Sequence, residues 1–217
     1  MITIHTQLIG QPQTNTDARG TWQSAIFRTP VAEPLLLQTR GLSGDQVADT
    51  KNHGSLDQAV CCHPSAHYDF WNDFYQLADD AKLSPGSVGE NWTLTNYTEA
   101  DVAVGDIFKV GSAVVQVSAP RYPCMKQERK LGLPNFLQEV LAHKRTGFYL
   151  RVLTPGEVKV GDELQLVERP NPIFTIQLVN ENTMGTPDAD VVEQLLALPT
   201  LSEGWKRILE HKLSSRK

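Results

Sequence analysis

A nine-residue pattern with Gly-Asp at its centre occurs twice in this chain, at residues 102–110 and again at residues 158–166. In both copies the Gly-Asp pair is followed by a segment that reads as an alternating strand. Alternation is typical of a β-strand, and glycine supplies the unusual backbone torsion that a tight turn before the strand requires. The repetition therefore predicts a β-barrel built from two related β-halves.

Period-two alternation bounded by turn residues predicts strands on both sides of the repeated pattern. These expected strands are Thr3–Ile9, Trp22–Arg28, Leu35–Gln38, Trp92–Leu94, Ala113–Val117, Phe148–Leu153 and Glu163–Val167. Helices are expected over residues 64–81, where aromatic residues recur at helical spacing behind Pro64, and over residues 135–143. Residues 40–57 are rich in Gly, Asp, Asn and His and are expected to form a functional loop.

The segment Arg169-Pro170-Asn171-Pro172 marks a boundary, because two prolines so close together break any regular element. Beyond this segment the strand pattern ends. We therefore expect a β-rich α+β chain with a barrel domain over residues 1–169 and a three-helix domain over residues 170–217. A bundle of about 45 residues is small for independent folding, so it is expected to pack on the barrel.

Helical apolar spacing carries the expectation for this C-terminal domain. It predicts three short helices, over residues 173–181, 188–198 and 202–213, with Asp188 and Ser202 as N-caps of the second and third. Such a bundle would either cover apolar barrel surface as a lid or dock a partner, and the partner could be a second copy of the chain in a homodimer.

Composition and charge exclude several classes of function. Hydrophobic residues make up 40% of the chain, which is enough for a proper core, and a net charge of -5 argues against long-range attraction of nucleic acid. No apolar run approaches the roughly 20 residues of a membrane helix, and the N-terminus lacks the basic and apolar segments of a signal peptide. We expect a soluble cytoplasmic protein that binds neither nucleic acid nor membrane.

The chain has three cysteines, an odd number that argues against a disulfide framework. Cys61 and Cys62 are adjacent, which does not match zinc-ligand spacing, and one is expected to face the core and the other a neighbouring element. Cys124 lies between Arg121 and Lys126, just after an expected strand. Nearby cations favour the thiolate, the form that attacks electrophiles or binds a soft metal. The alternative is a cysteine buried as a small hydrophobe beside solvated cations.

Several segments together resemble a known family. They are Gly41-Leu42-Ser43-Gly44-Asp45, Asn52-His53-Gly54 with Asp57, Ser87-Val88-Gly89-Glu90-Asn91, the Cys124 segment and the two Gly-Asp strands. In this order, and over nearly the whole chain, they resemble the MOSC domain, which is named after molybdenum cofactor sulfurase C-termini. They most closely resemble its stand-alone bacterial members of the YiiM type, which carry a three-helix C-terminal appendage. The resemblance implies a β-barrel with peripheral helices and a molybdenum cofactor (molybdopterin), held by its pterin and phosphate.

The resemblance also implies a reaction and the residues at its centre. Cys124 would be the thiolate ligand of molybdenum, and related proteins reduce N-hydroxylated compounds such as hydroxylaminopurines and amidoximes with electrons from a separate reductase. His53 corresponds to the histidine of the family's His-Gly-Gly loop, in which Ser55 here replaces the second glycine. His53 would donate a hydrogen bond to a cofactor oxo group or a substrate, or only order its own loop. Asp45 is expected to order its glycine turn.

Five further residues are candidates for cofactor binding under this resemblance. Arg121 and Lys126 would contact phosphate or pterin, because arginine offers a planar fork to oxyanions, and Lys51 would add to the same basic patch. Surface charge is the alternative for all three. Glu90 and Asn91 would bind pterin nitrogens or only cap the turn before their strand.

Two other functions remain open at this stage. Cys124 could carry a persulfide or the cofactor to another protein without catalysis, since the same cationic setting would serve a carrier. A metal-free thiol enzyme would instead use His53 as a base within hydrogen-bond reach of Cys124. The sequence has neither a ferredoxin-like cysteine set nor a Gly-rich dinucleotide fingerprint after a strand, so a reductase of this kind is expected to take its electrons from a partner.

Overall fold

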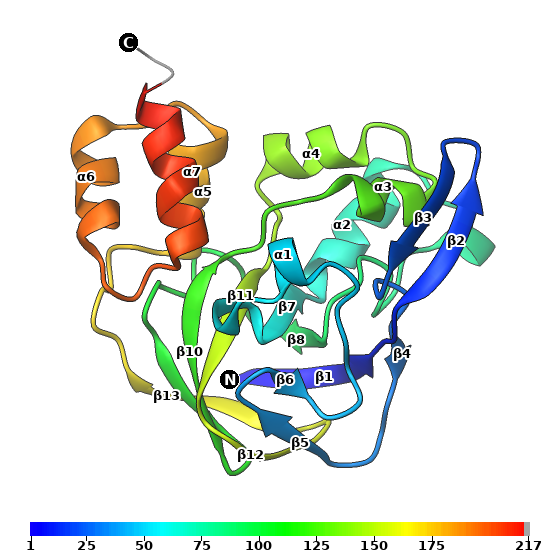
Figure 1. Ribbon diagram of the computed structural model, residues 1–217, viewed down its shortest axis with the longest axis horizontal. Coiled ribbons are helices and arrows are strands. Elements are labelled where there is room, and N and C mark those ends of the chain that lie inside the picture. Colours follow the sequence, from blue (N-terminus) through cyan, green and yellow to red (C-terminus); the bar gives the residue numbers. More distant parts are fainter. Residues whose placement is uncertain (215–217) are drawn as a thin grey trace.

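A computed structural model describes residues 1–214, apart from the side chain of Asn52. Within these residues the main sheet closes into a seven-stranded mixed barrel, because its two end strands pair at Ile2 and Leu164 (Figure 1). β7 and β8 run parallel and the other neighbours run antiparallel. In order around the barrel the strands are β13 (Glu163–Glu168), β9 (Ile107–Val110), β10 (Ala113–Pro120), β11 (Phe148–Thr154), β7 (Val60–Pro64), β8 (Trp92–Thr95) and β1 (Ile2–Ile9).

Smaller strands lie around this barrel. β4 (Thr29–Pro30) pairs with the end of β1, and β2 (Gln13–Asp17) and β3 (Gly20–Ser24) form a hairpin. A three-stranded sheet contains β12 (Gly156–Val158), β5 (Leu35–Gln38) and β6 (Gly41–Leu42). The predicted strand over residues 22–28 was therefore wrong beyond Ser24: the chain leaves the hairpin there, and the next residues line a cleft.

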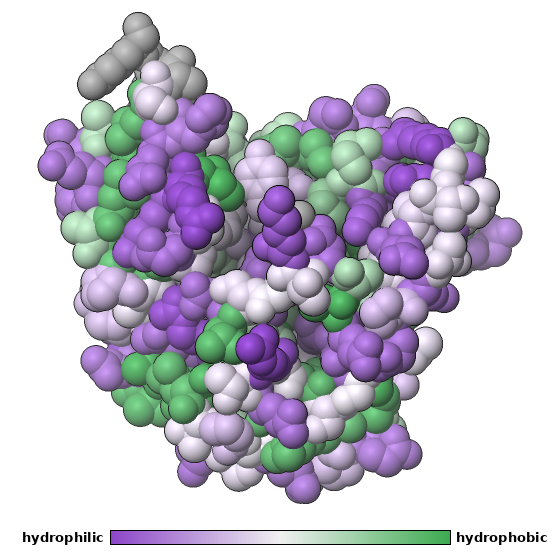
Figure 2. Space-filling view, viewed as in Figure 1, coloured by the Kyte–Doolittle hydropathy of each residue, from purple (hydrophilic) through white to green (hydrophobic). Residues whose placement is uncertain are grey.

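The helices lie outside the barrel. Figure 1 shows the C-terminal helices on one side of the molecule and α2, α3 and α4 with the β2–β3 hairpin on the other. On the face shown in Figure 2 hydrophilic side chains cover α7 and α1, whereas a hydrophobic area lies over β13. The helices are α1 (Thr50–His53), η1 (Leu56–Gln58), α2 (Ala66–Phe74), η2 (Asp79–Ala81), α3 (Met125–Leu131), α4 (Phe136–His143), α5 (Ile176–Met184), α6 (Ala189–Ala197) and α7 (Glu203–Ser214). No helix among the described residues has the length and apolarity that crossing a membrane requires.

The repeated Gly-Asp pattern forms two equivalent turns, as predicted. Gly105 and Gly161 adopt positive φ angles of 91° and 89°. In each turn the following aspartate accepts a 2.9 Å hydrogen bond from the backbone N–H three residues before it. The strands that follow, β9 and β13, pair with each other in the barrel, so the two copies of the pattern are structural neighbours.

The predicted helix over residues 64–81 was too long at both ends. Pro64 ends β7 rather than starting a helix, and α2 begins at Ala66 and stops at Phe74. The sequence analysis missed β7 because all five of its residues are buried. A strand buried on both faces shows no apolar-polar alternation, which is the signal that identifies a strand in sequence.

The three predicted C-terminal helices are present, although the first begins at Ile176 and is capped by Thr175, whose side chain accepts a hydrogen bond from Leu178 N. Asp188 caps α6 as predicted, and the Ser202 hydroxyl accepts a 3.4 Å hydrogen bond from the backbone of α7. Buried side chains of all three helices belong to the same hydrophobic cluster as the barrel strands. The bundle therefore packs on the barrel, and the boundary between residues 169 and 170 stays a prediction.

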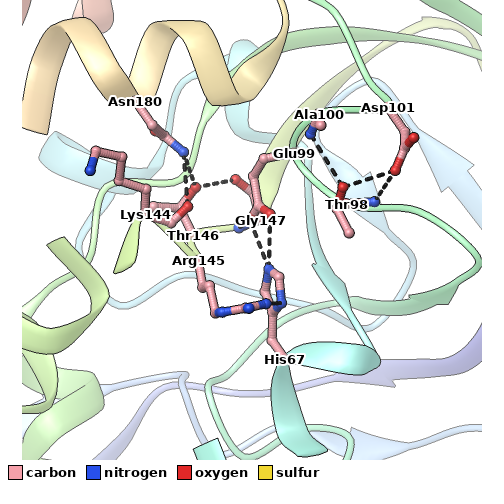
Figure 3. Close-up of polar contacts among 10 residues, drawn as sticks. All are labelled: His67, Thr98, Glu99, Ala100, Asp101, Lys144, Arg145, Thr146, Gly147 and Asn180. Carbon is pink, nitrogen blue, oxygen red and sulfur yellow. Dashed lines mark hydrogen bonds and ion pairs between the residues drawn. The ribbon is translucent and has the colours of Figure 1, made fainter. Parts of the chain in front are cut away.

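A buried polar cluster joins the barrel to these outer elements (Figure 3). His67 of α2 places Nε2 2.9 Å from both carboxylate oxygens of Glu99, and its Nδ1 lies 3.1 Å from Arg145 Nη1. Because a guanidinium only donates, Nδ1 accepts and Nε2 carries the proton that is donated to Glu99. Glu99 also accepts a 2.6 Å hydrogen bond from Gly147 N, while Asn180 of α5 donates to Thr146 Oγ1 at 2.9 Å.

His63 lies beside this cluster, and neither of its ring nitrogens has a hydrogen-bond partner within the described part of the chain. Its ring centroid is 5.1 Å from that of His67 and 5.2 Å from that of Tyr68. Burial lowers the pKa of His63 well below its usual value, and neighbouring His67 adds to this effect. The folded protein therefore holds His63 neutral at a pH where an exposed histidine would be charged.

This burial predicts a specific loss of stability in acid. With the folded pKa lowered, the stability linked to His63 is present above the unfolded pKa of about 6.5 and is lost as the pH falls below it. Between about pH 7.5 and about pH 5.5 the free energy of unfolding should drop by about 1.4 kcal/mol more in the wild type than in His63→Leu. Urea denaturation at both pH values measures the difference. An equal loss of unfolding free energy in the two proteins would show that His63 is not held neutral in the folded state.

Candidate functional site

A cleft of about 610 Å³, partly open to solvent, lies beside the barrel where the Cys124 loop meets residues 24–28 and the segment around α1. Five of the seven side chains predicted for the site line it: His53, Asn91, Arg121, Cys124 and Lys126. The other two lie elsewhere: Lys51 lines an adjoining groove, and Glu90 lines neither cavity. Residues distant in sequence are thus brought together around one opening.

Cys124 lies just beyond β10 on a short loop, as predicted, and directly precedes α3. Its φ of -131° is extended, and its backbone N–H donates a 3.1 Å hydrogen bond to Gln127 Oε1. Gln127 in turn donates through Nε2 to Val88 O at 3.4 Å. Gln127, in the first turn of α3, therefore links the Cys124 backbone to Val88 and holds the loop in place. The Cys124 side chain stays half-buried in the cleft.

Arg121 is buried, with only 7% of its surface exposed, so it is not the solvated surface charge that the sequence left open. One guanidinium nitrogen, Nη2, donates a 2.6 Å hydrogen bond to Val88 O, whereas Nη1 has no partner among the described residues. A buried cation with an unused donor is costly unless an anion or acceptor completes it. Since Arg121 lines the cleft, the structure contains a ready contact for an oxyanion there.

Arg28 is a third cation of the cleft, beside Arg121 and Lys126, and was not predicted from the sequence. Asp45 holds it through two 2.9 Å hydrogen bonds, from Nε and Nη2, and Nη1 donates to Gly89 O at 2.7 Å. Asp45 also accepts a 2.8 Å hydrogen bond from Gly10 N, a tertiary contact outside its own glycine turn, so its role in ordering that turn stays a prediction. Only tertiary contacts bring Arg28 to the site, so no local sequence signal identifies it.

The Asn91 amide is engaged by the protein itself. Its Oδ1 accepts a 3.0 Å hydrogen bond from Cys61 N, and its Nδ2 donates to Asp45 Oδ2 at 2.8 Å and to Leu8 O at 3.3 Å. These bonds tie β7 to the turn before β8 and place Asn91 on the wall of the cleft. A role in pterin binding stays a prediction.

Glu90 lies behind the cleft and is fully buried. Its Oε1 accepts hydrogen bonds from Tyr68 OH at 2.5 Å, Gly86 N at 2.8 Å and Thr93 Oγ1 at 2.6 Å. This arrangement orders the turn before β8, which is the structural one of the two roles predicted for Glu90.

His53, at the end of α1, faces the same cleft and is half-buried. Burial lowers its pKa, and the nearby charges of Arg121 and Lys126 lower it further while Asp49 opposes them. His53 is therefore neutral near pH 7 and can donate one hydrogen bond and accept another. No hydrogen bond joins His53 to Cys124 among the described residues, and the metal-free thiol enzyme lacks the contact that it requires.

Cys61 and Tyr149 are two more cleft residues that the sequence analysis did not assign. Burial raises the pKa of both groups, so both side chains stay protonated and neutral. Cys62 points into the hydrophobic core, so the prediction that the adjacent cysteines face different surroundings is confirmed. Cys61 lies on β7 and Tyr149 on β11, and the register of these paired strands sets the two residues opposite each other.

The cleft is thus cationic and contains one half-buried thiol. Within the part of the chain that the structure describes, no three His, Cys, Asp or Glu side chains are grouped so that they could hold a metal ion on their own. A metal at Cys124 would need most of its ligands from a bound cofactor.

The MOSC domain family matches residues 49–165, which is more than half of the chain and contains His53, Asn91, Arg121 and Cys124. The chain belongs to the MOSC family. The family of the YiiM-like, 3-alpha helix domain also matches, over residues 185–216. The chain is therefore a MOSC protein of the YiiM type with C-terminal helices, as the sequence predicted.

Relatives support this assignment over nearly the full length of the MOSC protein. Protein YiiM of Escherichia coli (strain K12) is 33% identical over 195 residues, which cover 89% of this chain and 86% of YiiM. The crystal structure of YiiM from Geobacillus stearothermophilus superposes with a TM-score of 0.82 at 32% identity and covers 98% of this chain and 100% of that one. A protein named "Reductase" from Gibberella moniliformis (strain M3125 / FGSC 7600) is 33% identical over 154 residues, 70% of this chain and 27% of that protein.

Proposed function

We propose that this MOSC protein binds a molybdenum cofactor in the cleft and reduces N-hydroxylated compounds, such as hydroxylaminopurines and amidoximes, with electrons from a separate reductase. The observation that carries the proposal is buried Arg121, whose Nη1 has no partner among the residues that the structure describes and which lies in the same cleft as the Cys124 thiol. An anionic ligand with a thiophilic metal would satisfy both groups at once.

The residues of the cleft fit such a cofactor. Arg121 and Lys126 would hold its phosphate or pterin oxygens, whereas Arg28 beside them is already paired with Asp45. Cys124 would ligate molybdenum through its sulfur, since a soft thiolate suits a soft metal centre. When bound, the group supplies the two-electron redox chemistry that amino-acid side chains lack.

The chain's own groups would position the substrate and manage protons. Reduction of an N-hydroxyl group breaks the N–O bond and forms an N–H bond, so R–NHOH takes up two electrons and two protons and yields R–NH2 and water. His53 and Tyr149 would donate hydrogen bonds to the substrate, because both are neutral donors that line the cleft. Burial, together with the nearby cations, lowers the pKa of His53 and keeps it unprotonated, so it can accept a proton from solvent and pass it on.

The partner reductase is part of the proposal. The Gibberella moniliformis relative named "Reductase" matches this chain over only 27% of its own length, so most of that protein lies outside the matched region. The unmatched regions of that long chain could deliver electrons to its matched region, whereas the shorter chain described here would receive them from a separate protein. The relative's name thus supports reductase chemistry, and the donor here would be a second protein.

Arg121→Met tests the cofactor contact. We expect the molybdenum content of protein from a cofactor-competent host to fall about 10- to 100-fold, because the variant loses a charged hydrogen bond to a buried anion. The stability of the cofactor-free protein should change by less than about 1 kcal/mol, since removing an incompletely paired buried cation is often neutral. Metal analysis and thermal unfolding measure the two effects, with Arg40→Met as control because Arg40 is exposed and lines neither cavity. Unchanged molybdenum content in Arg121→Met would contradict the proposed contact.

A carrier that delivers sulfur or cofactor without catalysis is the alternative function. Loaded protein, an electron donor and hydroxylaminopurine separate the two possibilities. Multiple turnovers with one molybdenum per chain support the reductase. A persulfide on Cys124 without molybdenum, found by mass spectrometry, supports the carrier and overturns the proposal.

A further inference from the structure

A second and larger groove, of about 1540 Å³ including space open to solvent, continues from the cleft. Cys124, His53 and Tyr149 line both cavities, so the groove and the cleft meet at the candidate reaction centre. The far wall of the groove is α7, which contributes Trp205, Arg207 and Ile208. The C-terminal helices therefore form part of the route to Cys124, besides packing on the barrel core.

The near wall of the groove has an exposed flat aromatic surface. Tyr122 is 44% exposed and Met125 is 46% exposed, although large apolar side chains of this kind are usually buried. The ring centroid of Tyr122 lies 6.0 Å from that of Trp205, so the α7 side chain packs against the tyrosine. An aromatic side chain fixed in this way can stack with a planar ring, and such stacking adds to burial because of the geometry of the two π-systems.

The charges of the groove favour an anion. Lys51, Lys126 and Arg207 line it, together with three acidic residues. Two of these acids are paired with cations that do not line the groove: Asp57 accepts from Arg151 Nε at 2.8 Å, and Glu203 is 3.0 Å from Lys206 Nζ. Asp49 is the third. The groove thus has three cationic side chains in its lining, and two of them, Lys51 and Arg207, line only this outer groove.

We propose that this groove binds a flat heteroaromatic ring that carries a phosphate, so that the substrate is the nucleoside 5′-monophosphate of an N-hydroxylated base rather than the free base. The ring stacks on Tyr122, the phosphate contacts Arg207 and Lys51, and the N-hydroxyl group points to the Cys124 end of the groove. The orientation of the N-hydroxyl group rests on the proposed function, whereas the recognition of ring and phosphate rests on the groove alone. The reaction is unchanged, with the N–O bond broken by two electrons from the partner.

Binding of the reaction product to the cofactor-free protein tests this directly. Isothermal titration calorimetry would compare adenosine 5′-monophosphate, adenosine and adenine. We expect the monophosphate to bind at least about tenfold more tightly than adenosine, because arginine and lysine form charge-assisted hydrogen bonds with phosphate. Equal affinity for the monophosphate and adenosine, or no binding of any of the three, would overturn the proposal.

Two variants assign the effect to residues. Arg207→Ala should remove the preference for the monophosphate and leave adenosine binding unchanged, whereas Tyr122→Ala should weaken both ligands to a similar degree. The matched controls are Arg40→Ala, another exposed arginine, and Phe74→Ala, whose side chain is 43% exposed; neither residue lines the groove. An unaltered preference in Arg207→Ala would refute the phosphate site.

Activity of the loaded protein separates this inference from the proposed function. A preference for the monophosphate in binding, without reduction of any hydroxylaminopurine form, would refute the reductase and leave the nucleotide site standing. Reduction of free base and monophosphate with equal kcat/KM would support the reductase and refute the nucleotide site.

Discussion

Cys124→Ala is expected to lose molybdenum and reductase activity together, each by at least about 100-fold. Replacing even the outer partners of metal ligands costs about 10- to 100-fold in affinity or activity, and the ligand itself should cost no less. Cys124 is the half-buried thiol of the cleft, and the other cysteine there, Cys61, stays protonated because burial raises its pKa. No neighbouring thiolate is therefore available to replace the lost ligand.

The measurement is molybdenum per chain, with turnover of hydroxylaminopurine, in protein from a cofactor-competent host. Cys62→Ala is the matched control, because it also removes one thiol, but from the hydrophobic core and outside the cleft. The control should keep its molybdenum and activity. If Cys124→Ala retains both at the level of the wild type, Cys124 is not the metal ligand. If it retains molybdenum and loses only activity, the sulfur takes part in the reaction without holding the metal.

Glu99→Ala should have the largest effect on stability, about 3 to 5 kcal/mol. Removing the buried carboxylate leaves two donors, His67 Nε2–H and Gly147 N–H, without their acceptor, and each buried unsatisfied group costs about 1 to 3 kcal/mol. Glu99 accepts hydrogen bonds from His67 and Gly147, and His67 lies against the Arg145 guanidinium (Figure 3). Burial opposes the charge on Glu99, but the hydrogen bonds from His67 and Gly147 outweigh it and lower the pKa of the carboxyl group.

Glu99→Ala should also disturb the candidate site, because Gly147 connects the buried polar cluster with Arg121 of the cleft. Gly147 donates to Glu99 through its N–H and accepts a 3.1 Å hydrogen bond from Arg121 N through its carbonyl. Urea denaturation measures the loss, and Glu193→Ala on α6 is the control, since an exposed substitution there should change stability by no more than about 0.5 kcal/mol. A loss below about 1 kcal/mol in Glu99→Ala would show that the cluster does not hold the fold together.

The sequence predicted those parts of the fold that depend on interactions between residues close together in the chain. The Gly-Asp turns before β9 and β13 need positive φ angles that glycine tolerates, and the aspartate closes each turn within three residues. The helix α6 starts where Asp188 supplies a cap, as predicted. β7 was missed because it is buried along its whole length, and the helix after it was extended backward to Pro64 for the same reason.

The residues of the candidate site likewise fall into those that the sequence predicted and those that only the folded structure brings together. Cys124 and its neighbouring cations form one short segment, so their proximity was visible in the sequence. Arg28 and Tyr149 reach the cleft only through tertiary contacts, and no spacing rule connects them with Cys124. The burial of Arg121, with one nitrogen left unpartnered, is likewise a property of the folded chain, and it turns a basic residue near a thiol into a contact for an anion.

The most direct test of the central claim is the molybdenum and pterin content of the wild-type protein, purified gently from a host that makes the cofactor. Mass spectrometry of the metal and fluorescence of the oxidised pterin would be measured on the same sample, with Cys124→Ala beside it. We expect about one molybdenum and one pterin for each wild-type chain, because the chain has a single proposed site, and a loss of molybdenum in the variant. Wild-type protein that contains neither molybdenum nor pterin, from a host in which another molybdenum enzyme is fully loaded, would contradict this claim.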